Sequence, residues 1–284
     1  MEYYDSHIHF IYNCSLGELQ QKIGLLEGAG FGGINILVMS EFPAEIETCL
    51  KMIPGIYHPL VDQQALENQK DPFEAINLPH HLKMIPFLDA RFMENHTDEK
   101  IKRYKQKGFR GIKLLYVPEE DREFRIGGME EAFGRTCKQS EKITSLIIEQ
   151  ASFLSMPILM HVDLKRYGDF VEEMIRSFPR THFNIPHFGY SRKAVSRLLD
   201  RYPNCYTDMS SLTAYMEKDP EAYKNFIQRY QDRVLFGSDG VIGQPEIIES
   251  ALQFMNRFLR DTKIFDKLVN KNYKSYMSLG SSPE

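Results

Sequence analysis

The feature that most constrains the fold of this sequence is a regular alternation of short apolar runs and longer segments with helical spacing. Each run is followed by a segment in which apolar and charged residues recur with a helical period. Parallel strands need crossover connections of this kind, and eight units in series are what a closed barrel requires. We therefore predict an α/β fold, a (β/α)8 TIM barrel, with an open doubly wound sheet as the competing topology. The runs, rich in Ile, Val, Leu and Phe, predict strands at residues 4–10, 33–39, 83–88, 111–117, 157–162, 182–187, 204–208 and 233–238.

The length of the chain suits one barrel domain over residues 1–284, because such barrels run to about 250 residues. Residues 54–82 form an excursion before the third strand, with a helix expected near 71–76. Its place on the entry side of that strand predicts a structural or oligomeric role. Residues 118–139 follow the fourth strand, on the face where barrel active sites are built, so we expect this loop to cover the site. A last helix and a frayed tail are expected over residues 265–284.

Composition excludes several classes of protein. The 42% of hydrophobic residues supply a core and argue against disorder. A net charge of −4 without a long basic run argues against nucleic acid or an anionic membrane as a partner, and no stretch reaches the roughly 18 apolar residues of a membrane span. Cys14, Cys49, Cys137 and Cys205 lack the spacing of a zinc knuckle or a secreted disulfide framework. The first motif begins at Asp5, which leaves no room for a cleaved signal, so we expect a cytoplasmic protein.

The segment YYDSHIHF places His7 and His9 two residues apart on the first predicted strand. Both imidazoles project from one face, the barrel interior, and can bind one ion together. Such a pair suits Zn²⁺, with Mn²⁺ or another divalent ion as alternatives, although a structural pair can imitate it. The prediction gains force because His161, His187 and Asp239 also fall at the ends of predicted strands. Polar groups there would be costly without partners, so we predict one shared polar site.

Five segments in this order, DSHIH, GFRGIKL, PILMH, IPHFG and VLFGSDG, resemble the amidohydrolase superfamily. More closely, they are similar to its amidohydrolase-related (amidohydrolase 2) branch of metal-dependent TIM-barrel hydrolases, which includes decarboxylases, lactonases and hydratases that act on carboxylated substrates. The similarity spans residues 5–240. It is specific for the superfamily and does not specify the reaction.

The resemblance implies a role for each matching residue. His7, His9 and His161 would bind the metal, and Asp239 would complete its coordination and take a proton from the attacking water. His187 would lie beside that water, to polarise the substrate or steer the nucleophile. The chemistry is consistent, because a divalent ion lowers the pKa of bound water towards about 7 and a nearby carboxylate can accept its proton.

Lys113 lies on the fourth predicted strand, where binuclear members of the superfamily carry a carboxylated lysine that bridges two metal ions. In that case Lys113 and His187 would both be ligands. A buried lysine loses its charge readily, which favours the modification. In a mononuclear site, Lys113 would instead bind a substrate carboxylate. Asp5 is expected either to brace the first-strand histidines or to serve in a turn or in packing.

Several basic residues fall just beyond strand ends, on the predicted active face of this acidic protein. Guanidinium groups bind carboxylates with two parallel hydrogen bonds, so we predict a small anionic, carboxylate-bearing substrate. Arg122 and Arg125 are assigned to its binding, together with Lys113, and Tyr190 is a candidate hydrogen-bond donor. The full set of basic residues is Arg91, Arg122, Arg125, Lys165, Arg166 and Arg192.

The leading functional hypothesis is hydrolysis of an amide or lactone by a metal-activated water. Non-oxidative decarboxylation or hydration uses the same ligands and stays an alternative. A TatD-like nuclease or other phosphoesterase also starts with an HxH strand, although Lys113, the SDG ending of the eighth strand and the acidic balance fit it less well. A barrel that binds a ligand without catalysis is a further alternative. The sequence argues against it, because a suitable residue is present at every expected ligand position. Whether the chain forms a homo-oligomer stays open.

Overall fold

The computed structural model of this protein describes residues 2–122 and 124–278. Its strands pair in parallel in the order β8-β7-β6-β5-β4-β3-β2-β1-β9. All eight predicted strands are present, and their sequential order excludes the doubly wound alternative. The strands are β1 (Tyr3–His9), β2 (Phe31–Val38), β3 (Lys83–Asp89), β4 (Gly111–Leu115), β5 (Ile158–His161), β6 (Phe183–Ile185), β7 (Cys205–Asp208), β8 (Val234–Leu235) and β9 (Gly240–Val241).

A single stretch of chain, residues 234–241, closes the barrel. Its first part, β8, pairs with β7, and its second part, β9, pairs with β1. Between them, the carbonyl of Phe236 accepts a hydrogen bond from the backbone N–H of Ser6, and the N–H of Asp239 donates to the carbonyl of His7. The fold is therefore a single-domain (β/α)8 TIM barrel, as predicted.

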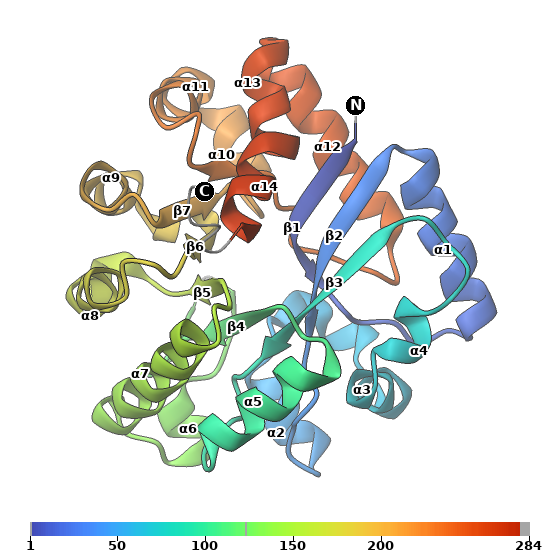
Figure 1. The fold of residues 1–284 in the computed structure, drawn as a ribbon, viewed down its shortest axis with the longest axis vertical. Helices are drawn as coiled ribbons and strands as arrows, with labels where there is room; N and C mark the ends of the chain where they lie inside the picture. Colours follow the sequence, from blue (N-terminus) through green and yellow to red (C-terminus); the bar gives the residue numbers. More distant parts are fainter. Residues whose placement is uncertain (1, 123, 279–284) are drawn as a thin grey trace, which may run out of the picture.

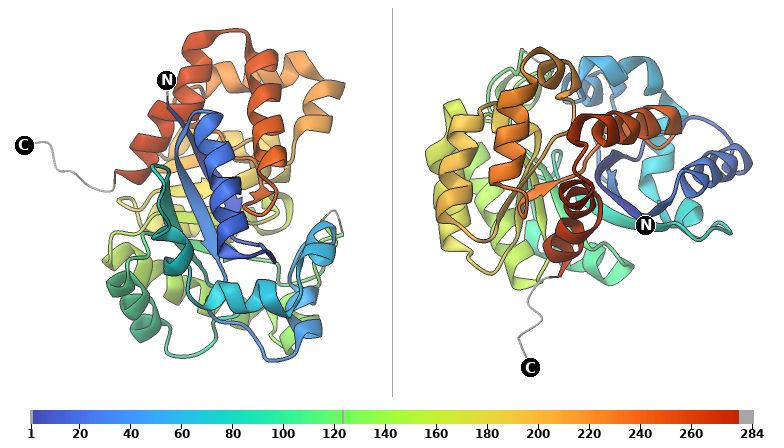
Figure 2. Two further views of the ribbon diagram at one scale, coloured as in Figure 1. Left: turned by 90° about the vertical axis from the view of Figure 1, so that its right-hand side faces the viewer. Right: turned by 90° about the horizontal axis from the view of Figure 1, so that it is seen from above.

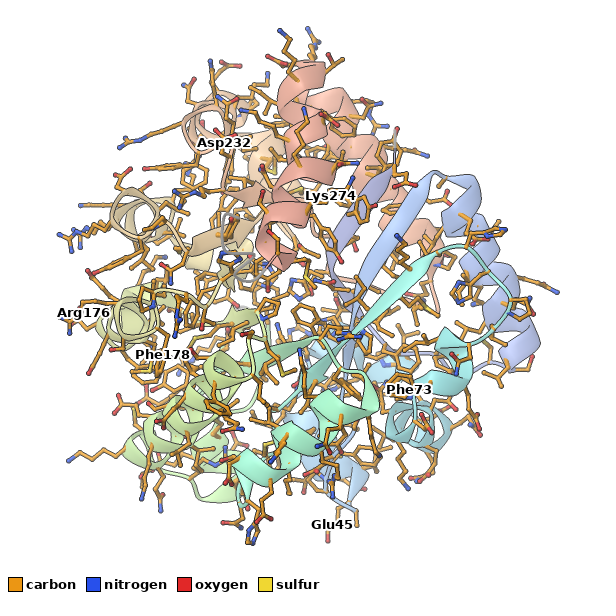
Figure 3. The ribbon with its side chains drawn as sticks, viewed as in Figure 1. Glu45, Phe73, Arg176, Phe178, Asp232 and Lys274 are labelled. Carbon is orange, nitrogen blue, oxygen red and sulfur yellow. The ribbon has the colours of Figure 1, made fainter. Side chains whose placement is uncertain are left out.

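Helices surround the strands as an outer ring, which Figure 1 shows along the shortest axis of the molecule. Two of the ring helices begin with a capping box, at Ser15 and at Thr136, where the side chain accepts a hydrogen bond from the third helical N–H. Charged side chains such as Arg176 and Asp232 lie at the periphery of this ring (Figure 3). The ring contains α1 (Leu16–Gly28), α5 (Thr97–Lys107), α7 (Cys137–Phe153), α8 (Leu164–Ser177), α9 (Arg192–Arg201), α11 (Pro220–Arg229) and α12 (Pro245–Leu259).

Shorter helices lie in the connections and at the end of the chain. They are α2 (Ile46–Lys51), the 3₁₀ helix η1 (Gly55–Leu60), α3 (Gln63–Lys70), α4 (Phe73–Ile76), α6 (Met129–Phe133), the turn η2 (Pro186–Tyr190), α10 (Thr213–Lys218), α13 (Thr262–Asp266), the π-helix η3 (Lys267–Lys271) and α14 (Asn272–Met277). The helix expected near 71–76 corresponds to α4. The last predicted helix corresponds to α13, η3 and α14, while the predicted tail over 279–284 lies outside the described residues.

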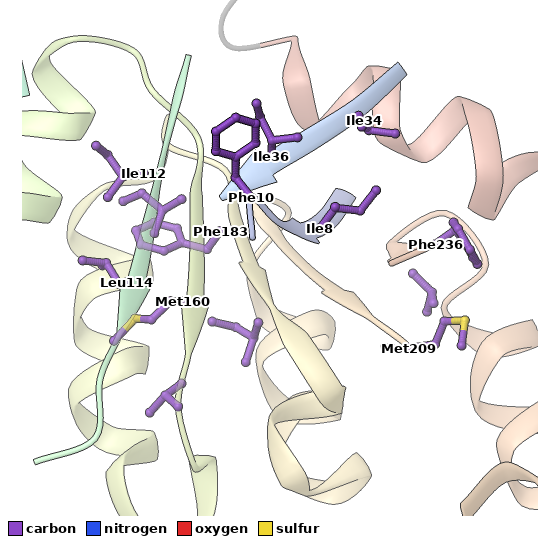
Figure 4. Close-up of a cluster of buried hydrophobic side chains, with 14 of the residues drawn as sticks. Ile8, Phe10, Ile34, Ile36, Ile112, Leu114, Met160, Phe183, Met209 and Phe236 are labelled. Atoms are coloured by element: carbon purple, nitrogen blue, oxygen red, sulfur yellow. The ribbon is translucent and has the colours of Figure 1, made fainter. Parts of the chain in front are cut away.

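The alternation of side chains along each strand separates the core from the site. Ile112 and Leu114 of β4 join the large apolar cluster between strands and helices, where Ile34 and Ile36 of β2 also lie (Figure 4). Lys113, between the two β4 residues, lies on the opposite face of the strand, which is the barrel interior. The same alternation places the imidazoles of β1 on the interior face.

The last helix fills the barrel from the end opposite the carboxyl ends of the strands. Tyr276 of α14 packs with Leu37, Phe87 and Leu159, which face the interior, and its carbonyl accepts a hydrogen bond from His182 at 2.8 Å. Figure 2 shows the C-terminal helices beside the first strand. Gly111 is required here, because a Cβ at this position would collide with the ring of Phe87. Within residues 2–122 and 124–278, no helix has the length and apolar character needed to cross a membrane.

Candidate metal centre

Three side chains meet where β1 ends and the chain passes from β8 to β9. Oδ1 of Asp239 lies 3.1 Å from Nε2 of His7 and 3.1 Å from Nε2 of His9. All three residues are buried, and one potential ligand atom from each lies within 4.8 Å of the others. Asp239 has a left-handed backbone, with φ of 57°, and its Oδ2 accepts a hydrogen bond from Ser211 at 2.6 Å. The carboxylate is thus held against both imidazoles.

The protonation of this group suits a cation. Burial lowers the pKa of His7 to about 4 and also lowers that of His9, so both imidazoles are neutral near pH 7. Burial alone would raise the pKa of Asp239, but the neighbouring histidines hold it well below its usual range. Within the described part of the chain, the buried Nε2 of His7 has no hydrogen-bond partner. An orphaned buried nitrogen is costly, and a bound cation would satisfy it. Two imidazoles and one carboxylate therefore fit a divalent ion such as Zn²⁺.

Asp208, at the end of β7, orients His7. Its Oδ2 lies 3.3 Å from Nδ1 of His7, which places the ring proton on Nδ1 and leaves the lone pair of Nε2 for an ion. The same carboxylate accepts hydrogen bonds from Asn184 at 2.9 Å and from the backbone N–H of His187 at 3.3 Å. Burial opposes the charge of Asp208, but His7 keeps its pKa below the usual range. Sequence reasoning missed Asp208, although it ends the seventh predicted strand and carries the same strand-end signal as the other site residues.

Asp5 acts on the backbone of β1 and not on the imidazoles. Its Oδ1 accepts a hydrogen bond from the N–H of His7 at 2.8 Å, and its carboxylate accepts another from the N–H of Ser238 at 3.2 Å. Burial raises the pKa of Asp5 to about 7. The two bonds tie β1 to the segment that carries Asp239, so Asp5 fixes the separation of the two parts of the group.

His161, a predicted ligand at the end of β5, lines the same cavity but is not part of the three-residue group. Its Nε2 lies 2.7 Å from the hydroxyl of Tyr190 and 3.5 Å from Oδ2 of Asp121. Burial lowers the pKa of His161 to about 3, so its ring is also neutral. The structure differs from the predicted four-ligand set because two loop side chains hold the nitrogen that would face the ion.

His187 follows β6 on an unusual turn. Residues 187–190 all have left-handed backbones, with φ values of 56°, 51°, 56° and 58°. Nδ1 of His187 lies 2.9 Å from the carbonyl of Ser210, which can only accept, so Nδ1 carries a proton and Nε2 takes no part in this bond. The ring centroid lies 5.4 Å from that of His7 and 5.2 Å from that of His161. The turn thus places His187 between the three-residue group and His161.

Two buried cations also line the cavity, Lys113 and Arg91. Burial lowers the pKa of Lys113 to about 8, while the nearby charges of Asp89 and Asp239 oppose that shift. Among the described residues, no hydrogen bond or ion pair to the Lys113 ammonium is found. Arg91 is fixed by Asp89, with Nε 2.9 Å from Oδ1, and donates to the carbonyl of Met52. The ammonium of Lys113 therefore lies beside the candidate metal ligands without a hydrogen bond or ion pair to a described residue.

The loop over residues 118–139 closes the cavity. An antiparallel bridge joins Asp121 to Ile126, and Phe124 packs against the rings of His161 and His187 at centroid distances of 5.6 and 5.0 Å. With Pro54, Phe124 and Ile126 leave a cavity of only about 10 Å³ above the candidate ligands. That volume corresponds to a single water molecule. A substrate can enter only after these side chains move.

The structure does not bring the predicted substrate residues Arg122 and Arg125 into this cavity. The side chain of Arg122 is 89% exposed and pairs with Glu120 at 3.2 Å. Arg125 is also exposed, between two residues that face inward, Phe124 and Ile126. For Arg125 the physical reason is the alternation of side chains between Phe124 and Ile126, whose register could not be derived from the sequence of the loop. Arg91 and Lys113 are the cations that line the cavity.

The excursion over residues 54–82 lies closer to the chemistry than expected. Tyr57 of η1 donates a hydrogen bond to the backbone carbonyl of Asp239, and its ring centroid lies 5.2 Å from that of His9. The N–H of Gly55 donates to the carbonyl of Phe124 at 3.2 Å. The predicted position on the entry side of β3 is wrong for these residues, because the chain stays at the carboxyl end of the barrel after α2. The structural role predicted for the excursion stays a prediction.

Comparison with known proteins places this geometry in a family. The amidohydrolase family model matches residues 4–272. The chain belongs to the amidohydrolase family. A search of curated protein sequences found no match. The superfamily inferred from the sequence motifs is therefore confirmed.

Solved structures show the same fold for amidohydrolase-family and related barrels. A Pseudomonas putida protein assigned as a 2-pyrone-4,6-dicarboxylic acid hydrolase has a TM-score of 0.55 and 13% identity, with 99% of each chain covered. The phosphotriesterase homology protein of Escherichia coli, complexed with phosphate, has a TM-score of 0.56 and 10% identity over 98% of this chain and 99% of that one. A TatD family hydrolase from Entamoeba histolytica has a TM-score of 0.53 and 10% identity over 99% of each chain. At these identities the similarity is one of fold.

Proposed function

We propose that this amidohydrolase-family protein is a metal-dependent hydrolase that cleaves an amide or lactone in a small, carboxylate-bearing substrate. The observation that carries the proposal is the convergence of two neutral imidazoles on one buried carboxylate, with Nε2 of His7 lacking a hydrogen-bond partner within the described residues. A divalent ion held by His7, His9 and Asp239 would supply Lewis-acid activation of water and of the scissile carbonyl.

The residues around this position would accept the proton, orient the water or substrate, and exclude bulk water. The carboxylate of Asp239 is ionised and fixed by Ser211, so it can accept the proton of the attacking water. Nε2 of His187 forms a hydrogen bond with the water or with the substrate and so sets its orientation. Asp208 keeps His7 in the required tautomer, and the closed loop excludes bulk water.

The buried cations support an anionic substrate. Lys113 has a positive charge and no protein partner within the described chain, and Arg91 lines the same cavity. A substrate carboxylate would satisfy Lys113 at the point where the metal residues meet. The alternative for Lys113 is carboxylation and the binding of a second ion, with His187 as a further ligand.

These two cations also favour a second candidate function, non-oxidative decarboxylation, because they would hold a carboxylate against the reacting centre. The two reactions give different products from related substrates. Hydrolysis yields an acid and an amine or alcohol, whereas decarboxylation releases carbon dioxide.

Metal analysis followed by a substrate panel tests the proposal. We expect one equivalent of Zn²⁺ or another divalent ion per chain by elemental analysis, and hydrolysis of at least one member of a panel of carboxylated lactones and amides. Two equivalents would assign Lys113 to a bridging role. Carbon dioxide release without hydrolysis would select the decarboxylase, and unchanged metal content in His7→Ala would refute the assigned centre.

A further inference from the structure

A groove in the outer ring of helices lies beside α7. It has a volume of about 840 Å³, and it is lined on one side by α7 and on the other by residues 94–98, which lead into α5. The two helices are neighbours in the ring (Figure 1). The residues that line this groove are different from those that line the metal cavity, so its role is separate from the proposed function.

α7 carries a second apolar row in addition to the face that packs on the barrel. Its buried face contains Ile147 and Ile148. The second row lines the groove, and Leu146 and Phe153 within it are 44% and 82% exposed. Its members recur at alternating spacings of four and three residues, as in the seam of a helix that packs against another helix. They are Gln139, Ile143, Leu146, Gln150 and Phe153.

Two opposite charges flank this row on one side. Lys142 and Glu149 both line the groove and are exposed, and no ion pair of either is found among residues 2–122 and 124–278. Each directly precedes a member of the row, so both occupy the same position of the repeat, beside the seam. They lie about 10 Å apart along the helix axis, too far to pair with each other. Their opposite charges are therefore available to a second molecule.

A second copy of α7 that runs antiparallel to the first supplies those charges. A twofold contact uses the same patch of both copies, so each residue pair occurs twice. Placing Ile143 against the partner's Leu146 brings Lys142 opposite the partner's Glu149. A shift by one heptad in either direction would bring two Glu149 or two Lys142 side chains together. A parallel pair would place both charges opposite apolar positions, so charge selects one antiparallel register.

The same register accommodates the most exposed side chain of the row. Gln139 then lies opposite the partner's Gln150, so the polar members of the row face each other. Phe153 lies opposite the first turn of the partner's α7, where residues 94–98 form the other side of the groove. An aromatic side chain of one copy thus enters the groove of the other, and the twofold axis repeats this contact at both ends of the helix pair.

We propose that a second copy of this chain covers the groove, with the two α7 helices packed antiparallel and Leu146 near the twofold axis. The inference does not depend on the proposed function. One helix pair with its flanking loops buries less surface than a standard interface, so the dissociation constant should be micromolar.

Sedimentation equilibrium of the full chain over a range of concentrations tests the dimer. Leu146→Glu places two carboxylates near the axis and should weaken dimerisation at least about 100-fold. Leu25→Glu is the matched control, because Leu25 of α1 is 57% exposed but lies outside the groove. This variant should dimerise like the wild type. Circular dichroism checks that each variant is folded.

Charge reversal tests the register. Lys142→Glu and Glu149→Lys each turn both attractive pairs into repulsive ones, and each should weaken dimerisation about tenfold. The double variant Lys142→Glu/Glu149→Lys restores opposite charges across the contact and should recover wild-type affinity. The recovery cannot arise within one chain, where the two positions are two helical turns apart. Lys193→Glu, at an exposed lysine of α9, should leave dimerisation unchanged.

Mixing the two single variants gives the sharpest result. A Lys142→Glu chain and a Glu149→Lys chain match in both pairs, so they should form a heterodimer more tightly than either variant pairs with itself. A wild type that stays monomeric at all concentrations would overturn the proposal and assign the groove to a different protein. A dimer that Leu146→Glu leaves intact would place the contact on another face, and a folded double variant without recovery would refute the register.

Discussion

The two walls of the metal cavity are built in different ways. One wall carries His7, His9 and Asp239 on strand ends that main-chain hydrogen bonds hold together, and its ligand atoms converge on one point. On the other wall, His161 also ends a strand, but its Nε2 is held by Tyr190 and Asp121 from two loops. The first wall is organised for a cation by the sheet itself. The second becomes available only when loop side chains release it.

Removing a ligand from the first wall should have the largest effect. His7→Ala deletes one of three converging donors, so metal affinity should fall by more than the roughly 100-fold that loss of an outer-shell partner can cause. Hydrolysis should fall to background. His96→Ala, at a histidine whose side chain is 74% exposed, is the matched control and should retain full metal content by elemental analysis. Equal losses in the two variants would show that the first wall is not the metal centre.

Breaking the support of the first wall should have the next largest effect. Asp208→Asn keeps the size of the side chain but removes the charge beside Nδ1 of His7, and we expect metal affinity to fall about 10- to 100-fold. Competition with a chelating dye measures the change. Circular dichroism should show an intact barrel, since the amide can still pair with Asn184. Wild-type affinity in this variant would argue that backbone geometry alone orients His7.

The pH dependence of the unfolding free energy compares how far the imidazoles of the two walls are buried from water. In the folded protein the pKa values of His7 and His161 are lowered to about 4 and about 3. Below pH 6.5 these two imidazoles therefore become protonated in the unfolded chain but stay neutral in the folded protein. Each of these two histidines should therefore lower the unfolding free energy of the metal-free protein by roughly 1 kcal/mol as pH falls from 7 to 5.5. His9, whose pKa is also lowered, acts in the same direction, and Asp5, whose pKa is raised, acts in the opposite direction. Urea unfolding at the two pH values measures the change.

Replacing one histidine in each wall measures how much that wall contributes to the pH dependence of the unfolding free energy. Compared with the wild type, His7→Gln and His161→Gln should each make the decrease in unfolding free energy between pH 7 and 5.5 smaller by roughly 1 kcal/mol, because each deletes one buried imidazole. The same pH dependence in both variants as in the wild type would contradict the burial of both imidazoles. An effect confined to one variant would show that the other wall is open to water.

Releasing the second wall should have the smallest effect. Tyr190→Phe removes the hydroxyl that lies 2.7 Å from Nε2 of His161. That nitrogen can then turn to the ion, and metal affinity should rise about fivefold, the equivalent of one hydrogen bond worth about 1 kcal/mol. Tyr167→Phe, which removes a hydroxyl bonded to Glu119, serves as the control. A loss of affinity in Tyr190→Phe would mean that Tyr190 supports the metal and does not compete with it.

The contrast between the walls also marks what sequence could predict. The β-α alternation and the strand-end position of His7, His9 and Asp239 are periodic signals, so the barrel and the position of these residues followed from them. The orientation of His161 did not, because it depends on side chains 40 residues before and 29 residues after it in the chain. Asp208 carried the strand-end signal and was overlooked.

The loops carried weaker signals than the strands. Phe124 and Ile126 face the cavity and Arg125 faces solvent only because of where the hairpin bridge falls. A shift of one residue would exchange them, and no periodic pattern in the segment fixes that register. The contact between Tyr57 and Asp239 likewise joins positions 182 residues apart, through a connection whose path the sequence leaves open.

The left-handed turn that carries His187 and Tyr190 has a consequence for divergence among relatives. Three of its four residues have a Cβ, and such conformations cost about 1–2 kcal/mol per residue. At the fourth, Gly189, a Cβ would collide with Leu164. Few substitutions can be accepted here, so a lineage that acquires a new substrate should keep this turn and accumulate its changes in the hairpin around Phe124. The metal residues and the turn would form the inherited part of the enzyme, and the hairpin the part that adapts.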